Sequence, residues 1–433
     1  MEAFVRRVKS FLAQLQQYNL SSSERKVVGL AALGGMLEFY DFIIYGMFSI
    51  YFADQFFPNG NAFISIIQSY IVFVLGYLAR PIGGIIFSYI GDEDGRKKVL
   101  IMTITLMGLS SLGIGILPPY KEIGMAAPII LLLLRLIQGL ALGGELPSTY
   151  VYINESMPNK LGTGFGCTMV GVNGGLLLGI IINQFINAYY SHQEIINYAW
   201  RFPFILGGIL CLISYKIRYS LHETQAFKQI VDKPKIPIFY LLKFHLFQVL
   251  MGIFITAIMS SMSVVVIVFM PTYLAKIIKI NQDLIPFLMF LTSIANLIII
   301  FLTGILANII HPKKIFLILI IIAIPLVFAC YYLLANQILL GISLITLGII
   351  EGVAAALTPL ILTTLFPTKV GLTGVAVCYN IGFTMFAGFA PVIITSLVNS
   401  GFNVFIVPVV YLWVMLILSL LGLLLIHKKL SEF

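Results

Sequence analysis

Six charged side chains interrupt long apolar stretches of the sequence: Glu38, Asp41, Arg80, Arg135, Glu145 and Glu351. A charged side chain at the centre of a lipid bilayer costs roughly 2.5–3.5 kcal/mol on insertion scales, so each must be paired, protonated or in contact with a wet cavity. Four carboxylates share two arginines, which leaves two carboxylates without a cation. Because a desolvated carboxylate can bind and release a proton, this excess of acid indicates proton coupling.

Helical spacing brings several of these residues onto common faces. One face of the first stretch carries Gly35, Glu38, Asp41 and Tyr45. One face of the fourth carries Arg135 and Glu145, about 15 Å apart along the axis and so too far apart to pair directly. We expect Asp41 to alternate between a proton and Arg135, the alternative being a permanent ion pair between two helices. The candidate proton-coupling residues are Asp41, Glu38, Glu145 and Glu351.

Arg135 is the first candidate for a ligand of the transported solute. Its planar guanidinium suits bidentate pairing with a carboxylate, and the alternative is a packing cation neutralised by Asp41. Other polar and aromatic side chains near the middle of the stretches could supply hydrogen bonds or aromatic faces. The alternative for each of them is ordinary packing between helices. These candidates are Gln138, Tyr40, Tyr45, Asn173, Asn296, Tyr379 and Asn380.

Membrane-spanning helices must position these residues. Of the 433 residues 60% are hydrophobic and only 10% charged, a composition that excludes a soluble protein. A helix needs about 20 apolar residues to cross a bilayer, whereas the short alternating runs of a β-barrel are absent. The sequence predicts an all-α membrane protein with twelve transmembrane helices, near residues 27–53, 62–90, 99–117, 124–153, 162–190, 200–219, 244–276, 284–310, 314–334, 337–366, 370–398 and 402–427.

The distribution of basic residues predicts the orientation. Twenty of the 26 Lys and Arg residues fall in segments on the same side as the N-terminus, four on the other side and two within the stretches. Because basic loops stay in the cytoplasm, both termini are predicted to be cytoplasmic. The net charge of +9 then reflects orientation, and we expect no nucleic-acid partner.

A polar interval divides the stretches into two sets of six. We expect a cytoplasmic N-terminal segment (1–26), a first six-helix bundle (27–219), a cytoplasmic linker (220–243), a second six-helix bundle (244–427) and a cytoplasmic tail (428–433). The connection from Gly84 to Lys98 returns in degenerate form from Gly304 to Lys314. Internal duplication of this kind is typical of transporters with a site between the halves.

Several motifs occur in order along the chain. They include Glu38-Phe-Tyr-Asp41, Arg80-Pro-Ile-Gly-Gly84, Gly91-Asp92-Glu-Asp-Gly95-Arg96-Lys97 and Gly143-Gly-Glu145. Together they resemble the major facilitator superfamily, and more narrowly its metabolite:proton symporter family. The resemblance implies two six-helix bundles that work by alternating access. It also implies a gate that holds the cytoplasmic side closed, formed by Arg80, Gly84, Asp92, Gly95, Arg96 and Lys97.

Members of that family carry osmolytes such as proline and betaine, or carboxylates such as 2-oxoglutarate, shikimate and citrate. Two membrane arginines favour a zwitterion or a small carboxylate over a tricarboxylate, so we expect proton-coupled uptake of a solute such as proline or betaine. The alternatives are a di- or tricarboxylate symporter and a drug:proton antiporter. No motif for a metal site, a nucleophile elbow or a phosphate loop occurs, so neither an enzyme nor a cofactor is expected. We expect a monomer in the inner (plasma) membrane whose partners are protons, the solute and lipid.

Overall fold

The computed structural model describes residues 20–58, 60, 62–231 and 233–430. Most of the predicted N-terminal segment 1–26 and half of the predicted tail 428–433 lie outside the described residues. All regular secondary structure within the described part of the chain is helical. Twelve helices there are long and apolar enough to cross a bilayer, which confirms the predicted fold class.

The first half of the chain supplies six of these spans. They are α2 (Ser22–Phe56), α3 with α4 (Ala62–Leu78 and Arg80–Glu93), α5 (Arg96–Ile116), α7 (Ala126–Ser156), α8 (Leu161–Tyr189) and α10 (Arg201–Tyr219). Three short turns join them: α6 (Tyr120–Ile123), α9 (His192–Glu194) and the π-helical η1 (Ile195–Ala199). The segment predicted as the linker contains α11 (Gln225–Lys228) and α12 (Pro237–Phe244).

The second half repeats the pattern with more interruptions. Its unbroken spans are α15 (Ile285–Leu306, preceded by the 3₁₀ turn η4, Gln282–Leu284), α16 (Pro312–Ala335), α17 (Leu340–Thr363) and α20 (Ile406–Leu430). One interrupted helix runs through α13 (Leu246–Met262), η2 (Ser263–Val268), α14 (Met270–Thr272) and η3 (Tyr273–Ile278). The other runs through η5 (Thr368–Val370), α18 (Gly371–Gly382), η6 (Phe383–Ala387) and α19 (Ala390–Asn399).

The interruptions have a chemical cause. The segments η2 and η6 are π-helical, and Pro271 and Pro391 follow them closely. Proline lacks a backbone donor and clashes with the carbonyl four residues earlier, so the hydrogen-bond ladder is loosened at these points. Single π-helical turns inside α-helices are frequent at functional sites.

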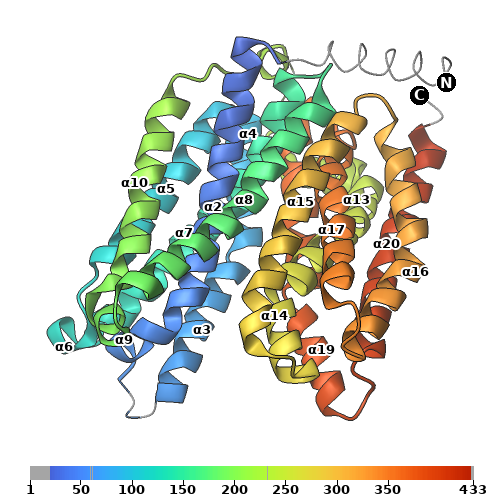
Figure 1. Ribbon diagram of the computed structural model, residues 1–433. Helices are drawn as coiled ribbons and strands as arrows, with labels where there is room; N and C mark the ends of the chain where they lie inside the picture. Colours follow the sequence, from blue (N-terminus) through green and yellow to red (C-terminus); the bar gives the residue numbers. More distant parts are fainter. Residues whose placement is uncertain (1–19, 59, 61, 232, 431–433) are drawn as a thin grey trace.

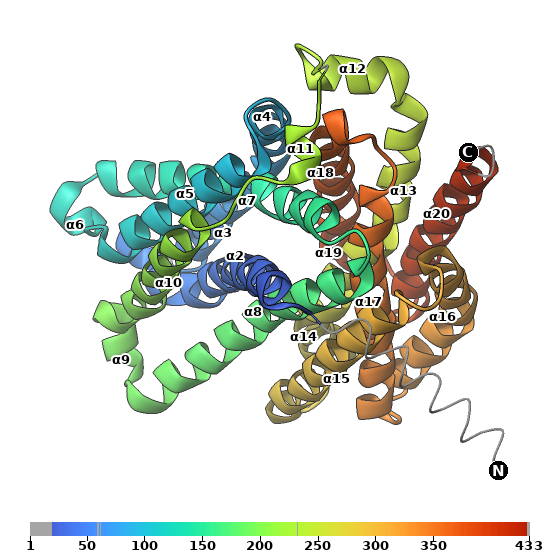
Figure 2. The same cartoon turned by 90° about the horizontal axis from the view of Figure 1, so that it is seen from above.

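The two halves stand side by side, blue to green on the left of Figure 1 and yellow to red on the right. Large apolar side chains such as Ile71, Ile321 and Leu424 are exposed along the spans, as a lipid-facing surface requires. The halves meet where α4 and α7 pack on α18 and where α8 packs on α15 and α17. In Figure 2, α4 and α18 lie in the upper part of the molecule and α8, α15 and α17 in the lower part.

One side of the molecule, which we call the basic face, carries the start of α2, the end of α20 and five connections. These are the turns α4–α5, α7–α8 and α15–α16, the segment from α10 to α13 and the segment from α17 to α18. Gly95 has a φ of 118° in the α4–α5 turn, a conformation that disfavours a Cβ. The turn therefore depends on glycine to bring Arg96 back against the end of α4.

Candidate transport site

A small cavity of about 30 Å³ lies between the two halves. The first half contributes wall residues from α2, α3, α4, α7 and α8, and the second half contributes residues from η2 and η6. The lining side chains are Glu38, Phe39, Tyr77, Arg80, Leu142, Asn173, Leu176, Ser263, Val264, Val268 and Phe383. The helix interruptions of the second half therefore lie at the cavity wall.

Glu38 and Arg80 are the charged residues of this wall. The Arg80 Nη2 atom lies 3.5 Å from the Glu38 Oε1 atom, longer than the ~2.7–2.9 Å of a charge-assisted hydrogen bond. Among the described residues nothing donates a hydrogen bond to either carboxylate oxygen of Glu38. The Arg80 guanidinium carbon lies 5.2 Å from the centre of the Tyr77 ring and 5.7 Å from that of Phe383. The cavity thus offers one anion and one cation, both with unused hydrogen-bonding capacity, together with two aromatic faces.

The position of Arg80 corrects its predicted place in the gate. Arg80 and Asp92 both lie on α4, twelve residues apart, which corresponds to about 18 Å along the helix axis. Arg80 lines the cavity and pairs with Glu38, whereas Asp92 contacts the other half at the basic face. The sequence resemblance groups the two because they are close in the motif, although a helix of this length separates them in space.

Asp41 belongs to a chain of hydrogen bonds inside the first half. Its carboxylate accepts one hydrogen bond from Ser111 Oγ at 2.6 Å and another from Gln138 Nε2 at 2.5 Å. The Oε1 atom of Gln138 in turn accepts a hydrogen bond from Arg135 Nη1 at 2.8 Å. Asp41 and Arg135, predicted to meet directly, are therefore joined through the amide of Gln138.

Arg135 is held by aromatic rings. Its guanidinium carbon lies 4.0 Å from the centre of the Tyr45 ring and 5.3 Å from that of Phe73. The hydroxyl of Tyr45 donates to the Ser69 carbonyl at 3.2 Å. Neither Arg135 nor Tyr45 is among the residues that line the cavity, so in this conformation the predicted carboxylate ligand is a neighbour of the site.

A buried ion pair between Glu145 and Arg218 corrects two expectations. Arg218 was assigned to the basic cytoplasmic segments, yet its side chain is only 1% exposed and its two terminal nitrogens contact the Glu145 carboxylate at 2.5 and 3.0 Å. Thr103 donates a third hydrogen bond to the same carboxylate at 2.5 Å. A Cβ at Gly34 would collide with the Arg218 guanidinium, so this pair depends on glycine. Glu145 is neutralised here and is not one of the surplus carboxylates.

Glu351 is a buried carboxylate, as its position inside an apolar stretch predicts. It is fully buried on α17, where its carboxylate accepts hydrogen bonds from Ser263 Oγ at 2.7 Å and from Asn296 Nδ2. Because Arg218 joins the buried cations, the predicted surplus of two carboxylates falls to one, and that one is Glu351.

Of the remaining predicted ligands, Asn173 lies at the cavity wall and Tyr40 contributes to helix packing. Asn173 lines the cavity, and its Nδ2 atom donates to the Met169 carbonyl of its own helix at 3.1 Å. Tyr40 lies outside the lining, because its hydroxyl donates to the carbonyl of Pro203 on α10 at 2.9 Å.

The last two predicted ligands lie on α18. Asn380 Nδ2 donates to the Gly143 carbonyl at 2.8 Å and so joins the halves. A Cβ at Gly84 would lie 2.5 Å from that same nitrogen, which explains a glycine at this contact. The ring of Tyr379 lies 5.8 Å from the Arg80 guanidinium carbon, next to the cavity wall.

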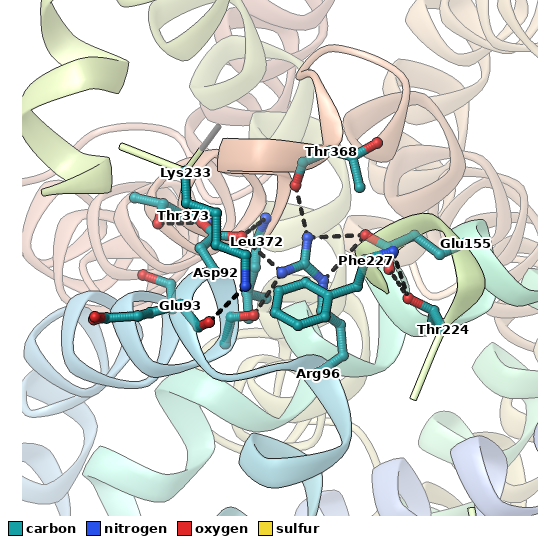
Figure 3. A network of polar contacts seen from close by, with 12 residues as sticks. Asp92, Glu93, Arg96, Glu155, Thr224, Phe227, Lys233, Thr368, Leu372 and Thr373 are labelled. Carbon is teal, nitrogen blue, oxygen red and sulfur yellow. Dashed lines mark hydrogen bonds and ion pairs between the residues drawn. The ribbon is translucent and has the colours of Figure 1, made fainter. Parts of the chain in front are cut away.

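Two residues of the predicted gate, Asp92 and Arg96, belong to a polar network at the basic face (Figure 3). We call this network the charged latch: Asp92, Arg96, Glu155, Thr368, Leu372 and Thr373. The Asp92 carboxylate accepts hydrogen bonds from the backbone nitrogens of Leu372 and Thr373 at 3.3 and 2.9 Å, at the start of α18. Thr373 Oγ1 adds a third at 2.6 Å. A carboxylate at a helix N-terminus is stabilised by the helix dipole.

Arg96 is the centre of the charged latch. Fully buried, it contacts Asp92 at 3.1 Å and Glu155 at 2.9 Å, and its Nη2 atom also donates to the Thr368 carbonyl of the other half at 2.7 Å. The linker closes over it, because the Phe227 ring centre lies 4.8 Å from the guanidinium carbon. Glu223, also in the linker, accepts a hydrogen bond from the backbone nitrogen of Lys97 at 3.1 Å.

A second contact between the halves, the neutral latch, consists of Gly162, Thr163 and Gly166 of α8 with Gly304 and Asn308 at the end of α15. Asn308 Oδ1 accepts a hydrogen bond from the Gly162 backbone nitrogen at 2.9 Å, and Asn308 Nδ2 donates to Thr163 Oγ1 at 2.6 Å. A Cβ at Gly304 would lie 2.5 Å from the Gly166 Cα atom, so the two helices touch along their backbones.

Comparisons with known proteins agree with this architecture. The Major Facilitator Superfamily model matches residues 31–371. A Staphylococcus haemolyticus protein, provisionally named a proline/betaine transporter, is 32% identical over 93% of this chain and 87% of its own. The inner membrane metabolite transport protein YhjE of Escherichia coli is 30% identical over 95% and 96%. The solved structure of the proton:xylose symporter XylE, 16% identical, covers 94% of this chain and 96% of its own with a TM-score of 0.75.

The chain belongs to the major facilitator superfamily. Within it, the curated relatives place the chain in the metabolite:proton symporter family, as the motifs indicate. The protein is a multi-pass transporter of the cell membrane and not an enzyme.

Sequence reasoning missed several polar partners in this transporter. Ser111 and Thr103 lie in apolar stretches where a hydroxyl carries no signal of its own. Ser263 opens an interruption for which Pro271 was the available signal. The position of Arg218 in the sequence carries a signal for a buried partner. This residue lies within the final turn of a predicted span, where an arginine can either enter the cytoplasm or turn inward to a buried acid.

Proposed function

We propose that this transporter takes up a small zwitterionic solute, of the proline or betaine type, together with a proton by alternating access. The observation that carries the proposal is the Glu38–Arg80 pair in an aromatic-lined cavity between the halves. Arg80 would bind the carboxylate of the solute. Glu38 with the Tyr77 and Phe383 rings would bind its ammonium group, because cations are attracted to aromatic faces.

The charges of the wall favour a zwitterion over a multiply charged anion. Arg80 is the one cation among the described residues that line the cavity, and Glu38 lies 3.5 Å from it. A tricarboxylate would leave two of its charges without a partner and would be repelled by Glu38. Relatives provide independent support, because one from Dickeya dadantii, 28% identical over 92% of this chain, is named a glycine betaine/proline/ectoine/pipecolic acid transporter.

Asp41 is the carboxylate that we assign to proton coupling. Gln138 separates it from Arg135, so a small movement of that amide would change whether Asp41 faces a cation. A carboxylate whose cation is withdrawn in a low-dielectric site binds a proton. We also propose that the basic face is cytoplasmic, because basic connections are retained there. The two latches would then close the cytoplasmic side while the solute binds from outside.

Uptake by proteoliposomes tests the proposal. The protein is reconstituted and offered labelled proline, glycine betaine, 2-oxoglutarate and citrate, with and without an inside-alkaline pH gradient. We expect saturable uptake of proline or betaine that the gradient drives above equilibrium. Saturable uptake of citrate alone would refute the argument from charge, and uptake indifferent to the gradient would refute symport.

A variant separates coupling from binding. Asp41→Asn should abolish accumulation driven by the gradient and leave solute counterflow, because the amide keeps the hydrogen-bonding geometry without the titration. Glu38→Gln is the matched comparison and should weaken counterflow itself, since it removes a charge from the cavity wall. Full accumulation by Asp41→Asn would remove Asp41 from the coupling mechanism.

A further inference from the structure

Glu351 is a buried carboxylate in the second half for which the structure offers no cation. Six ion pairs occur among the described residues, and all of them join residues between Glu24 and Arg218. The elements that hold Glu351 and its two hydrogen-bond donors, namely α13, η2, α15 and α17, contain no other titratable side chain. No positive charge on these elements therefore stabilises the ionised form of Glu351 at this depth in the membrane.

Other helices packed against α17 also leave Glu351 without a charged neighbour. Their titratable side chains nearest the middle of the spans are Cys330 and Tyr331 on α16, Cys167 on α8, Tyr150 on α7, and Cys378 and Tyr379 on α18. Arg135 and Glu145 on α7 are engaged with Gln138 and Arg218. Within the described chain no ion pair joins any of these groups to Glu351, whose hydrogen-bond partners are Ser263 and Asn296.

Ser263 connects Glu351 to the cavity. Its side chain belongs to the cavity wall together with Glu38 and Arg80, and its hydroxyl is 2.7 Å from Glu351 Oε1. A single hydroxyl group therefore separates the fully buried carboxylate from the space where the solute is proposed to bind. Ser263 is also the first residue of the π-helical segment η2, where the backbone ladder is loosened.

The hydrogen-bond geometry distinguishes a proton from a metal cation. Asn296 Nδ2 donates both to the Gly348 carbonyl at 2.9 Å and to Glu351 Oε2, and the carbonyl fixes which end of the amide faces that way. The carboxylate thus faces N–H and O–H donors, whereas a sodium ion would require several oxygen lone pairs aimed at one point. These donors leave no room for a metal ion, and it is the burial of the carboxylate without a cation that favours a bound proton.

We propose that Glu351 is a second proton-binding site, separate from Asp41, which is loaded from the cavity through the hydroxyl of Ser263. A hydronium ion in the cavity gives a proton to Ser263 Oγ while the original hydroxyl proton moves to Glu351 Oε1. The products are a water molecule and a neutral carboxylic acid, so charge and atoms balance. Only the consequence for transport rests on the proposed function, because the protonation itself requires no solute.

Infrared difference spectroscopy between high and low pH tests the protonation directly. Purified protein in lipid without solute should show the carbonyl stretch of a protonated carboxylic acid that is lost in Glu351→Gln. Glu194→Gln, at an exposed position between spans, is the control and should keep that band. Identical difference spectra for the wild-type protein and Glu351→Gln would overturn the proposal. A band that sodium chloride abolishes at constant pH, when choline chloride does not, would also overturn it in favour of a cation site.

The route and the consequence need separate readouts. Ser263→Ala should keep the band of Glu351 and slow its appearance at least tenfold after a rapid drop in pH, because the hydroxyl relay is gone. An unchanged rate would remove Ser263 from the route. In proteoliposomes Glu351→Gln should lower the measured proton-to-solute ratio while counterflow persists. If the band is lost and the ratio is unchanged, Glu351 binds a proton but the link to transport is wrong.

Discussion

The two latches at the basic face join the halves with different chemistry. In each, a side chain at the end of one helix caps the N-terminus of a helix in the other half: Asp92 caps α18, and Asn308 caps α8. Each capping residue also contacts a threonine in the first turn of its target helix, Thr373 or Thr163.

The difference between them lies in charge and in packing. The charged latch places Asp92 and Glu155 around a fully buried Arg96 within the first half. Its contacts with the second half are hydrogen bonds in which Asp92 and Arg96 are the charged partners. The neutral latch has an amide in place of the carboxylate, and its glycines bring the two backbones into contact. The comparison teaches that the same cap geometry is made once with a charged carboxylate and once with a neutral amide.

Removal of the central cation should have the largest effect. Arg96→Gln leaves Asp92 and Glu155 buried without a counter-charge, and breaking a buried pair from one side costs about 3–5 kcal/mol. We expect a lower midpoint of thermal unfolding in detergent, followed by intrinsic fluorescence, and labelling of a cysteine placed in the cavity from the basic face. A midpoint within experimental error of the wild-type protein would show that the charged latch contributes no stability.

Exchanging the two caps should sharpen the comparison. Asp92→Asn gives the charged latch the chemistry of the neutral one and should cost about 1.5–3 kcal/mol, the range for hydrogen bonds to charged groups. Asn308→Asp should instead strengthen the neutral latch by about 0.3–1 kcal/mol through the dipole of α8. Cysteine accessibility from the basic face should rise in the first variant and fall in the second. Opposite shifts would mean that charge does not distinguish the latches.

Widening the backbone contact tests the neutral latch. The added methyl of Gly166→Ala would lie 2.8 Å from the Gly304 Cα atom, and overpacking of this kind costs about 1–3 kcal/mol. Gly174→Ala on the same helix is the matched control, because its Cβ meets nothing within 4 Å. The two variants are compared by thermal unfolding and by solute counterflow. Equal behaviour would contradict a tight contact between α8 and α15.

The smallest effect is expected beside the charged latch. Lys98 pairs with Asp94 at 2.6 Å, but the two side chains are 54% and 45% exposed. Exposed pairs contribute about 0–1 kcal/mol, so Lys98→Gln should leave both the unfolding midpoint and cysteine accessibility nearly unchanged. A loss comparable to that of Arg96→Gln would mean that the latch extends further into solvent than its buried core.

The sequence was sufficient for the fold, because apolar length and basic loops are properties of the chain itself. It also singled out Glu351 and Asp41, since a charge within an apolar stretch is conspicuous at any depth. The sequence was insufficient to predict which buried charges pair with one another. Whether Arg80 meets Glu38 or Asp92 depends on distance along a helix, and whether Arg218 turns inward depends on the space left by Gly34. Such pairings are decided by packing between helices that are distant in the sequence.

The uneven placement of ion pairs has a mechanical consequence. Arg218 fastens the end of α10 to the carbonyl of Leu100 on α5 and to Glu145 on α7, so the first half is cross-braced near the basic face. None of the ion pairs that join two described residues lies in the second half, and two of its helices are interrupted by π-helical turns at the cavity. During a change of conformation we expect the first half to move as a rigid body and the second half to bend at η2 and η6.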